Sequence, residues 1–208
     1  WNQTAGRGRL GRSWTSPAGK SLALSLELGP ELMPEELSDS WRGALPLVTG
    51  AHLVGSLKSV SDGVGLKWPN DVLIDGKKVA GILGQIPEPQ RVIIGVGINV
   101  WLTDEELPTP DSTSLALHGL KDPSQFHVVI RDFIAALVSS LHSMRHGVPD
   151  QLWDSIRGAL STLGREVRVI LPDGQELVGT AIDLDTTGRL VIRDGFGDSH
   201  VVSAADVH

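Results

Sequence analysis

The stretch KWPNDVLIDGKKVAGILGQ, residues 67–85, carries the strongest short-range turn signal in the chain. Asp75-Gly76 lies between two apolar runs, residues 72–74 and 79–86. This dipeptide suits the two-residue turn of a β-hairpin, in which both turn residues need positive φ. A further short strand is expected at residues 66–68, where Pro69 ends it. The stretch therefore predicts three short strands in succession, with a hairpin between the second and the third.

The flanking segments extend this sheet. Residues 91–99, RVIIGVGIN, form an almost continuous apolar run, which predicts a central strand buried on both faces. Ser21–Leu28 alternates apolar and polar residues, as a half-buried strand does. Residues 35–60 have helical periodicity, with Pro34 and Pro46 placed to begin two separate helices. These patterns predict a mixed β-sheet with flanking helices.

The pattern changes towards the C-terminus. Residues 123–145 carry apolar side chains on one helical face, and a further helix is expected over residues 150–160. From Gly164 onward, short strands follow one another without a helical pattern, which predicts a small β-barrel. Turn signals separate these strands at residues 172–174, 187–188 and 195–198. We expect an α/β (α+β) domain over residues 1–161 and an all-β domain over residues 162–208.

Composition limits the class of function. The chain has 208 residues and no cysteine, which excludes a disulfide framework, a cysteine-based zinc site and a thiol nucleophile. No uninterrupted apolar run reaches the roughly 18 residues of a membrane helix, and no basic, apolar leader is visible. We therefore expect a cytoplasmic protein with no membrane partner. Because the chain begins at Trp1 rather than Met, we also expect it to be a fragment or a processed product.

Charge is distributed unevenly along the chain. The net charge is -7, which disfavours general binding to nucleic acid, so we expect no nucleic-acid partner. The first 26 residues nevertheless carry four cations and no acid. Those cations are Arg7, Arg9, Arg12 and Lys20. A solvated basic arm is one reading of such a segment, and a binding site for a small anion is the other.

The motif QTAGRGRLGRSW, residues 3–14, favours the anion site. It contains the spacing G-x-G-x-x-G, but no buried strand precedes it, as a dinucleotide fingerprint requires. Glycines allow the backbone to approach a ligand closely, and arginines offer donor pairs that match carboxylates and phosphates. We expect this loop to be mobile when empty and to become ordered around an anion.

Polar residues near the Asp75-Gly76 turn suggest a second part of a site. Asn70 and Asp71 follow a strand end, and Lys78 lies across the hairpin. An ordinary turn and a solvated hairpin are the alternatives, while in a site Asp71 would orient a lysine or help to hold magnesium. The glycines within the strands indicate close approach by a ligand or by another part of the backbone. They are Gly81, Gly84, Gly95 and Gly97. Asn99 ends a buried strand, so its amide needs partners.

Taken together, QTAGRGRLGRSW, KWPNDVLIDGKKVAGIL and IGVGIN resemble the biotin–protein ligases. The three motifs stand in that family's order, and the predicted C-terminal barrel extends the resemblance over the whole chain. The resemblance implies a catalytic domain with a fold like that of class II aminoacyl-tRNA synthetases, followed by an SH3-like barrel. The spacing of the arginine and glycine loop separates it from the related lipoate–protein ligases.

The resemblance also implies a reaction and its site. Biotin and ATP, with Mg²⁺, would form biotinyl-5′-AMP, and biotin would then pass to a lysine of a biotin carboxyl carrier protein, a subunit of an acyl-CoA carboxylase. No residue is assigned as a metal ligand. The resemblance places biotin at Gln3, Arg7, Gly8, Arg9 and Lys78, the nucleotide at Arg12, Trp14, Gly81 and Asn99, and catalysis at Arg9, Lys78 and Asp71.

Other readings stay open. A lipoate or other acyl-acid ligase of the same superfamily is one, and a non-catalytic biotin-sensing regulator or truncated pseudoenzyme is another. In the family, a Ser/Thr-rich stretch that lines the biotin pocket precedes the first motif, and we expect it to be missing here. The oligomeric state, with a homodimer as one option, and an upstream DNA-binding domain are left undecided.

Overall fold

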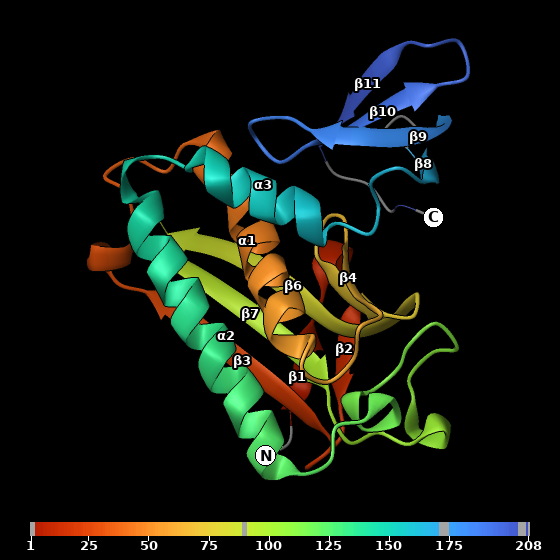
Figure 1. Ribbon diagram of the computed structural model, residues 1–208. Helices are drawn as coiled ribbons and strands as arrows, with labels where there is room; N and C mark the ends of the chain where they lie inside the picture. Colours follow the sequence, from red (N-terminus) through yellow and green to blue (C-terminus); the bar gives the residue numbers. More distant parts are fainter. Residues whose placement is uncertain (1–2, 89–90, 171–174, 204–206, 208) are drawn as a thin grey trace.

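The computed structural model describes residues 3–88, 91–170, 175–203 and 207. Within them it contains a five-stranded sheet, a four-stranded sheet, a two-stranded hairpin and three α-helices (Figure 1). The strands of the first part are β1 Gln3–Arg7, β2 Ser13–Ser16, β3 Ser21–Leu28, β4 Val64–Lys67, β5 Asp71–Ile74, β6 Lys77–Glu88 and β7 Arg91–Asn99. Those of the second part are β8 Glu166–Ile170, β9 Glu176–Leu184, β10 Leu190–Asp194 and β11 Ser199–Val202. The helices are α1 Asp39–Leu57, α2 Pro123–Ser143 and α3 Asp150–Ala159, with short 3-10 helices η1 Arg9–Gly11, η2 Pro30–Leu32, η3 Asp104–Glu106, η4 Leu115–His118 and η5 Met144–His146. The mixed α/β class is as predicted.

The five-stranded sheet has the order β3-β7-β6-β5-β4, and all its described strand pairs are antiparallel, so the prediction of a mixed sheet is wrong in this respect. Helix α1 packs on β4, β5 and β6, while α2 and α3 pack on α1, so the helices cover one face (Figure 1). The hairpin β1–β2 packs against β3 and β7. Because side chains alternate along a strand, β7 turns Val96 and Ile98 into the helix-covered core and Gly97 towards the hairpin. One face of the sheet is thus closed by helices, and the other carries the hairpin.

The predicted turn at Asp75-Gly76 is confirmed. Asp75 has φ 50° and Gly76 has φ 80°, the left-handed conformation that a tight hairpin requires at both positions. The expectation that residues 91–99 are buried on both faces is wrong. Strand β7 does lie inside the sheet, but its residues alternate between buried and half-buried, because glycines rather than large apolar side chains face the hairpin.

The prediction of two helices within residues 35–60 is wrong, because a single helix, α1, spans Asp39–Leu57 with Pro46 inside it. Its N-cap is Ser38, whose side chain accepts a hydrogen bond from the backbone of Trp41 at 3.2 Å. An internal proline costs about 3 kcal/mol, whereas each fully buried large apolar side chain contributes about 1.5–3 kcal/mol. Several such side chains on α1 are buried, so packing outweighs the proline and the helix continues.

Helix α2 confirms the predicted amphipathic pattern, with Phe133, Leu137 and Leu141 buried. The stretch Pro123–His146 is long and apolar enough to cross a membrane by length and composition, although polar and charged residues interrupt its apolar runs. The expectation of no such segment is therefore not met on that criterion. One helix of this kind is weak support for a membrane span, and the buried face of α2 packs on α1.

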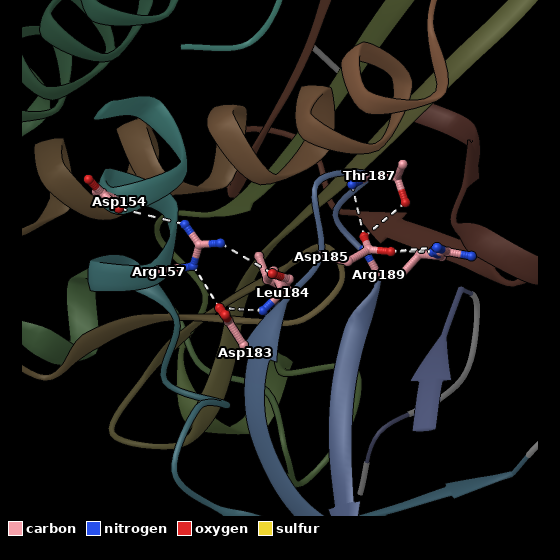
Figure 2. A network of polar contacts seen from close by, with 7 residues as sticks. All are labelled: Asp154, Arg157, Asp183, Leu184, Asp185, Thr187 and Arg189. Atoms are coloured by element: carbon pink, nitrogen blue, oxygen red, sulfur yellow. Dashed lines mark hydrogen bonds and ion pairs between the residues drawn. The ribbon is translucent and has the colours of Figure 1, made fainter. Parts of the chain in front are cut away.

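The C-terminal part forms an antiparallel sheet in the order β11-β10-β9-β8, consistent with the SH3-like fold expected there. The expected turn at residues 172–174 lies outside the described residues. Arg157 of α3 reaches this sheet through Asp183, with 2.7 Å between Nε and Oδ1, and donates to the Leu184 carbonyl at 3.2 Å (Figure 2). Asp185 stabilises the following turn by accepting hydrogen bonds from Thr187 and Arg189 (Figure 2). The second sheet is thereby fixed against the helical layer.

Candidate functional site

The hairpin β1–β2 and the uncovered face of the sheet enclose a cavity of about 380 Å³. Its floor includes glycines of β6 and β7, and its walls come from the hairpin and from residues 67–71. Every site residue predicted from the sequence lines this cavity, with the exception of Asn99. Two segments that are more than fifty residues apart in the chain therefore meet in one site.

Backbone hydrogen bonding closes the turn of the hairpin. Gly8 N donates to Arg12 O at 2.7 Å across the turn that contains η1. The Arg9 guanidinium reaches the opposite wall, where its Nη1 donates to Asn70 Oδ1 at 3.1 Å. This is a strand–turn–strand unit with no α-helix after the glycines, so the G-x-G-x-x-G spacing is not a dinucleotide fingerprint. The expected mobility of the loop stays a prediction.

Trp14 closes one side of the cavity. A Cβ atom added at Gly97 would lie 2.5 Å from Cε2 of Trp14, and one added at Gly81 would lie 3.4 Å from its ring. Gly81 and Gly97 therefore leave room for the indole side chain on the sheet, whereas the predicted approach by a ligand or by backbone stays a prediction. Gly84 differs, because a Cβ there would meet nothing within 4 Å. Nothing in its surroundings requires glycine.

Lys78 and Asp71 form an ion pair in the cavity wall, with 2.7 Å between Nζ and Oδ1. They lie on paired strands, β6 and β5, and both side chains are about one third exposed or less. The Lys78 ammonium also lies 5.7 Å from the centroid of the Trp14 ring, a cation–π distance. Lys77 is exposed. The hairpin therefore separates a solvated lysine from one directed into the site.

Asn70 was noted in the sequence but was not assigned to the site. It bridges strand β6 and the hairpin: its Nδ2 donates to Ile82 O at 3.0 Å, and its Oδ1 accepts from Arg9. Its position between a strand end and Asp71 was the available signal. Asn70 therefore fixes the position of the Arg9 guanidinium against the opposite wall of the cavity.

Asn99 lies outside the cavity lining and is only 1% exposed. Its Nδ2 donates to Thr113 O at 3.0 Å, whereas Oδ1 is buried and has no hydrogen-bond partner among the described residues. Asn99 follows Gly97 by two positions on β7, so both face the same side of the sheet. Because buried polar atoms usually have hydrogen-bond partners, Asn99 Oδ1 is an acceptor to which a bound group could donate.

Among the described residues that line the cavity, Asp71 supplies the one carboxylate that could bind magnesium. No group of three or more histidine, aspartate or glutamate side chains that could hold a metal ion occurs in the described part of the chain. Mg²⁺ is commonly held by one or two carboxylates together with the phosphates of a substrate. The residues present fit an ion that enters with a nucleotide, and they do not form a cage of their own.

Comparison with known sequence families gives two matches. A model described as the biotin/lipoate A/B protein ligase family matches residues 1–99. A second, described as the biotin protein ligase C-terminal domain, matches residues 162–208. The two matches cover the hairpin with the five-stranded sheet, and then the C-terminal sheet.

Among curated proteins, the chain is 40% identical to the biotin–[acetyl-CoA-carboxylase] ligase of Mycobacterium tuberculosis, over 99% of the chain and 76% of that protein. It is 31% identical to the protein of the same name from Paracoccus denitrificans, over 99% of the chain and 86% of that protein. The bifunctional ligase/repressor BirA of Bacillus subtilis is 30% identical over 97% of the chain, which spans 62% of that relative.

Solved structures give the same likeness. The biotin protein ligase of Aquifex aeolicus, in complex with biotin and ATP, superposes with a TM-score of 0.79 at 28% identity, over 100% of this chain and 85% of that one. The biotin protein ligase of Leishmania major, in complex with biotinyl-5-AMP, has a TM-score of 0.56 at 25% identity, over 98% of this chain and 86% of that one. Both segments that match the family models therefore have counterparts in these structures.

Proposed function

The chain belongs to the biotin–protein ligase family, and on that premise we propose that it activates biotin with ATP and transfers it to a lysine of a biotin carboxyl carrier protein. In the first step, a biotin carboxylate oxygen bonds to the α-phosphorus of ATP, and the bond to pyrophosphate breaks. In the second, the lysine amine bonds to the acyl carbon, AMP leaves and the amine gives up a proton. The carrier is a carboxylase subunit, and the protein would act in the cytoplasm.

The charge of the cavity is the observation that carries this proposal. Among the described residues, its lining contains several cations and one carboxylate, that of Asp71, in a chain whose net charge is -7. Those cations are Arg7, Arg9, Arg12, Lys67 and Lys78. A carboxylate and a triphosphate repel each other and must still meet for the first step. A cationic cavity removes that obstacle, and two reactants held together gain on the order of 7 kcal/mol or more towards the barrier.

We assign the biotin end of the cavity to Gln3, Arg7, Gly8, Arg9 and Lys78. Two of the three cations in this set reach it from opposite walls: Arg9 from the hairpin, fixed by Asn70, and Lys78 from β6, fixed by Asp71. Their charges screen the biotin carboxylate and stabilise the charge that develops at phosphorus. Supporting this assignment is the convergence of both side chains on one cavity of about 380 Å³.

We assign the nucleotide to Arg12, Trp14, Gly81 and Asn99. Trp14 offers an aromatic face, and the buried Oδ1 of Asn99 would accept from a nitrogen donor such as an adenine amino group. Asn99 does not line the cavity, so a nucleotide must extend beyond the described lining to reach it. When bound with ATP, Mg²⁺ neutralises phosphate charge, and Asp71 is the described cavity carboxylate that would help to hold it.

Asp71 has a second assigned role, in the transfer step. A lysine arrives at neutral pH as an ammonium ion and must lose a proton before it attacks. Asp71 already holds one ammonium group at 2.7 Å, that of Lys78, and its carboxylate can orient or deprotonate a second. The hairpin over the cavity limits the access of water to the mixed anhydride.

We further propose that the two domains divide at residues 161 and 162. Leu160 forms an isolated bridge to Leu66, and Ser161 N donates to Leu66 O at 2.9 Å, so the end of the first domain is tied to strand β4. Thr162 Oγ1 accepts from Trp68 N at 2.9 Å. The connection is therefore anchored beside the cavity wall formed by residues 67–71.

The test is direct. The chain is incubated with biotin, ATP, Mg²⁺ and a carrier domain, and pyrophosphate, adenylate and carrier-bound biotin are followed. Biotin on the carrier with release of pyrophosphate is the expected result. Binding of biotin without pyrophosphate would indicate a non-catalytic regulator instead. Displacement of biotin by an equal concentration of lipoate would favour a lipoate ligase.

A further inference from the structure

Thr113 is the centre of a hydrogen-bond network behind two of the assigned site residues. Its backbone N donates to Lys78 O at 2.8 Å, and its carbonyl accepts from Asn99 Nδ2 at 3.0 Å. Lys78 N in turn donates to Asp111 O at 2.7 Å, so the segment pairs with the start of β6 like a short parallel strand. The side chain of Thr113 is 2% exposed. Its backbone thereby connects Lys78 with Asn99.

The hydroxyl of Thr113 is itself held. His118 Nε2 lies 2.8 Å from Thr113 Oγ1, and His118 Nδ1 lies 3.4 Å from Asp75 Oδ2 in the β5–β6 turn. With Nδ1–H directed to the carboxylate, Nε2 accepts from the threonine hydroxyl; a protonated ring donates at both nitrogens. Either form keeps the contact. Carboxylate, imidazole and hydroxyl thus form a chain from the turn to Thr113.

We propose that Thr113 and His118 are positioning residues for nucleotide binding, an inference that rests on the proposed ligase function. The Thr113 carbonyl accepts from the Asn99 NH₂ group and so turns Oδ1 away from itself, as an acceptor without a partner among the described residues. The same residue holds the backbone at Lys78. His118 holds the Thr113 hydroxyl, and Thr113 in turn contacts Asn99 and the backbone of Lys78. The orientation of the Asn99 and Lys78 side chains therefore depends on a hydroxyl outside the assigned biotin and nucleotide sites.

A purely structural role would look like the pair His52 and Ser140. There, Nε2 lies 2.7 Å from Oγ and joins α1 to α2 within the helical layer. Neither residue lines the cavity. The two imidazole–hydroxyl pairs have nearly the same distance and similar burial, but only that of Thr113 adjoins Lys78 and Asn99. They form a matched comparison between positioning and packing.

The experiment compares Thr113→Val, Thr113→Ser, His118→Ala and Ser140→Ala with the parent. Dissociation constants for ATP and for biotin are measured separately by calorimetry, alongside thermal unfolding and adenylate formation. Thr113→Val and His118→Ala should weaken ATP binding about tenfold, or about 1.4 kcal/mol, and biotin binding less than about twofold. Thr113→Ser keeps the hydroxyl and should stay within about twofold of the parent for ATP. Ser140→Ala should lower the unfolding temperature and leave ATP affinity unchanged.

Equal losses for Thr113→Ser and Thr113→Val would overturn the inference, as would equal losses of ATP and biotin affinity in Thr113→Val. His118→Ala serves if Thr113→Val does not fold, and parent-like ATP affinity in that variant would also overturn it. A parent that binds ATP but forms no adenylate would refute the proposed function alone, because the ATP affinities still test the positioning role. A parent that binds no ATP would refute both.

Discussion

Trp14 occupies the space that a side chain at Gly97 would take. A Cβ atom at position 97 would lie 2.5 Å from Cε2 of the indole and 2.7 Å from its Nε1. Both distances are far below van der Waals contact, so the hairpin can rest on β7 only because residue 97 has no side chain. Trp14 also lies near the ammonium group of Lys78, so the position of the hairpin affects the surroundings of a charged group in the cavity.

Gly97→Ala should therefore damage the site. The added methyl group must displace Trp14, and with it the β1–β2 hairpin, so we expect adenylate formation to fall by about tenfold or more at fixed substrate concentration, with a loss of about 1–3 kcal/mol in stability from overpacking. Gly84→Ala is the matched control, because a Cβ on that neighbouring strand meets nothing within 4 Å. Steady-state rates and unfolding curves of both variants check this, and similar behaviour of the two would contradict the steric argument.

Arg9→Gly should weaken retention of the adenylate more than its formation. Loss of one charge-assisted interaction costs about 1.5–3 kcal/mol, so release of biotinyl-5′-AMP should accelerate by about tenfold to a hundredfold. The measurement is the rate at which preformed, labelled adenylate leaves the protein. Arg131→Ala, on the exposed side of α2 beside Asp132, is the control and should release it like the parent. A parent-like residence time for Arg9→Gly would refute the role assigned to Arg9.

Asp71→Asn separates the two steps of the reaction. The amide keeps the shape of the carboxylate but cannot accept a proton, so transfer to the carrier should slow by about a hundredfold or more. Adenylate formation should suffer less if Asp71 acts chiefly in transfer. Single-turnover assays with preformed adenylate and carrier measure the second step alone. Equal slowing of both steps would instead favour the role of Asp71 in holding Lys78 or Mg²⁺.

Sequence patterns predicted correctly those structural features that are determined by residues close together in the chain. The Asp75-Gly76 hairpin follows from the φ values that this turn needs, and the face of α2 follows from helical spacing. Pro46 was misread because burial of the whole of α1 outweighs a local preference that is visible in sequence. Thr113 gave no signal in the sequence, because its contacts with Lys78, Asn99 and His118 arise only when the fold brings these residues together. Asn99 was assigned from its place at a strand end, but it does not line the cavity, and its contact with a nucleotide stays a prediction.

The turn that begins at Asp185 should contribute stability that is lost in acid. Partial burial raises the pKa of Asp185, but hydrogen bonds from Arg189 and Thr187 lower it more, and the net pKa lies below the ordinary value of 3.8. A carboxylate with a lowered folded-state pKa stabilises the fold above its unfolded-state pKa, and that contribution disappears as pH falls through the folded-state value.

Asp185→Asn should therefore unfold at lower temperature than the parent near pH 7, with the difference shrinking below about pH 4. Asp198→Asn, in the β10–β11 turn, is the control, and thermal unfolding between about pH 3 and pH 7 decides the matter. A difference that is independent of pH would contradict the electrostatic account.

Close packing at Gly43 connects this same turn to the site. A Cβ at Gly43 of α1 would lie 1.8 Å from the carbonyl oxygen of Thr187, so α1 and the turn touch backbone to backbone. The next carbonyl, that of Gly188, accepts from the Trp68 indole at 2.9 Å. Trp68 in turn lines the cavity, close in the chain to Asp71. A displacement of this turn should therefore change the position of Asp71.

Gly43→Ala tests that connection. The methyl group must push the turn away from α1 and leave the Trp68 indole without its acceptor, so we expect a loss of about 1–3 kcal/mol in stability together with slower transfer of biotin to the carrier. Gly55→Ala, in the same helix with nothing within 4 Å of the added Cβ, should be neutral or slightly stabilising, because alanine favours helix by up to about 1 kcal/mol. Unfolding curves and single-turnover transfer rates are compared for the two variants. If Gly43→Ala lost stability but transferred biotin at the parental rate, the C-terminal turn would support the fold without influencing the site.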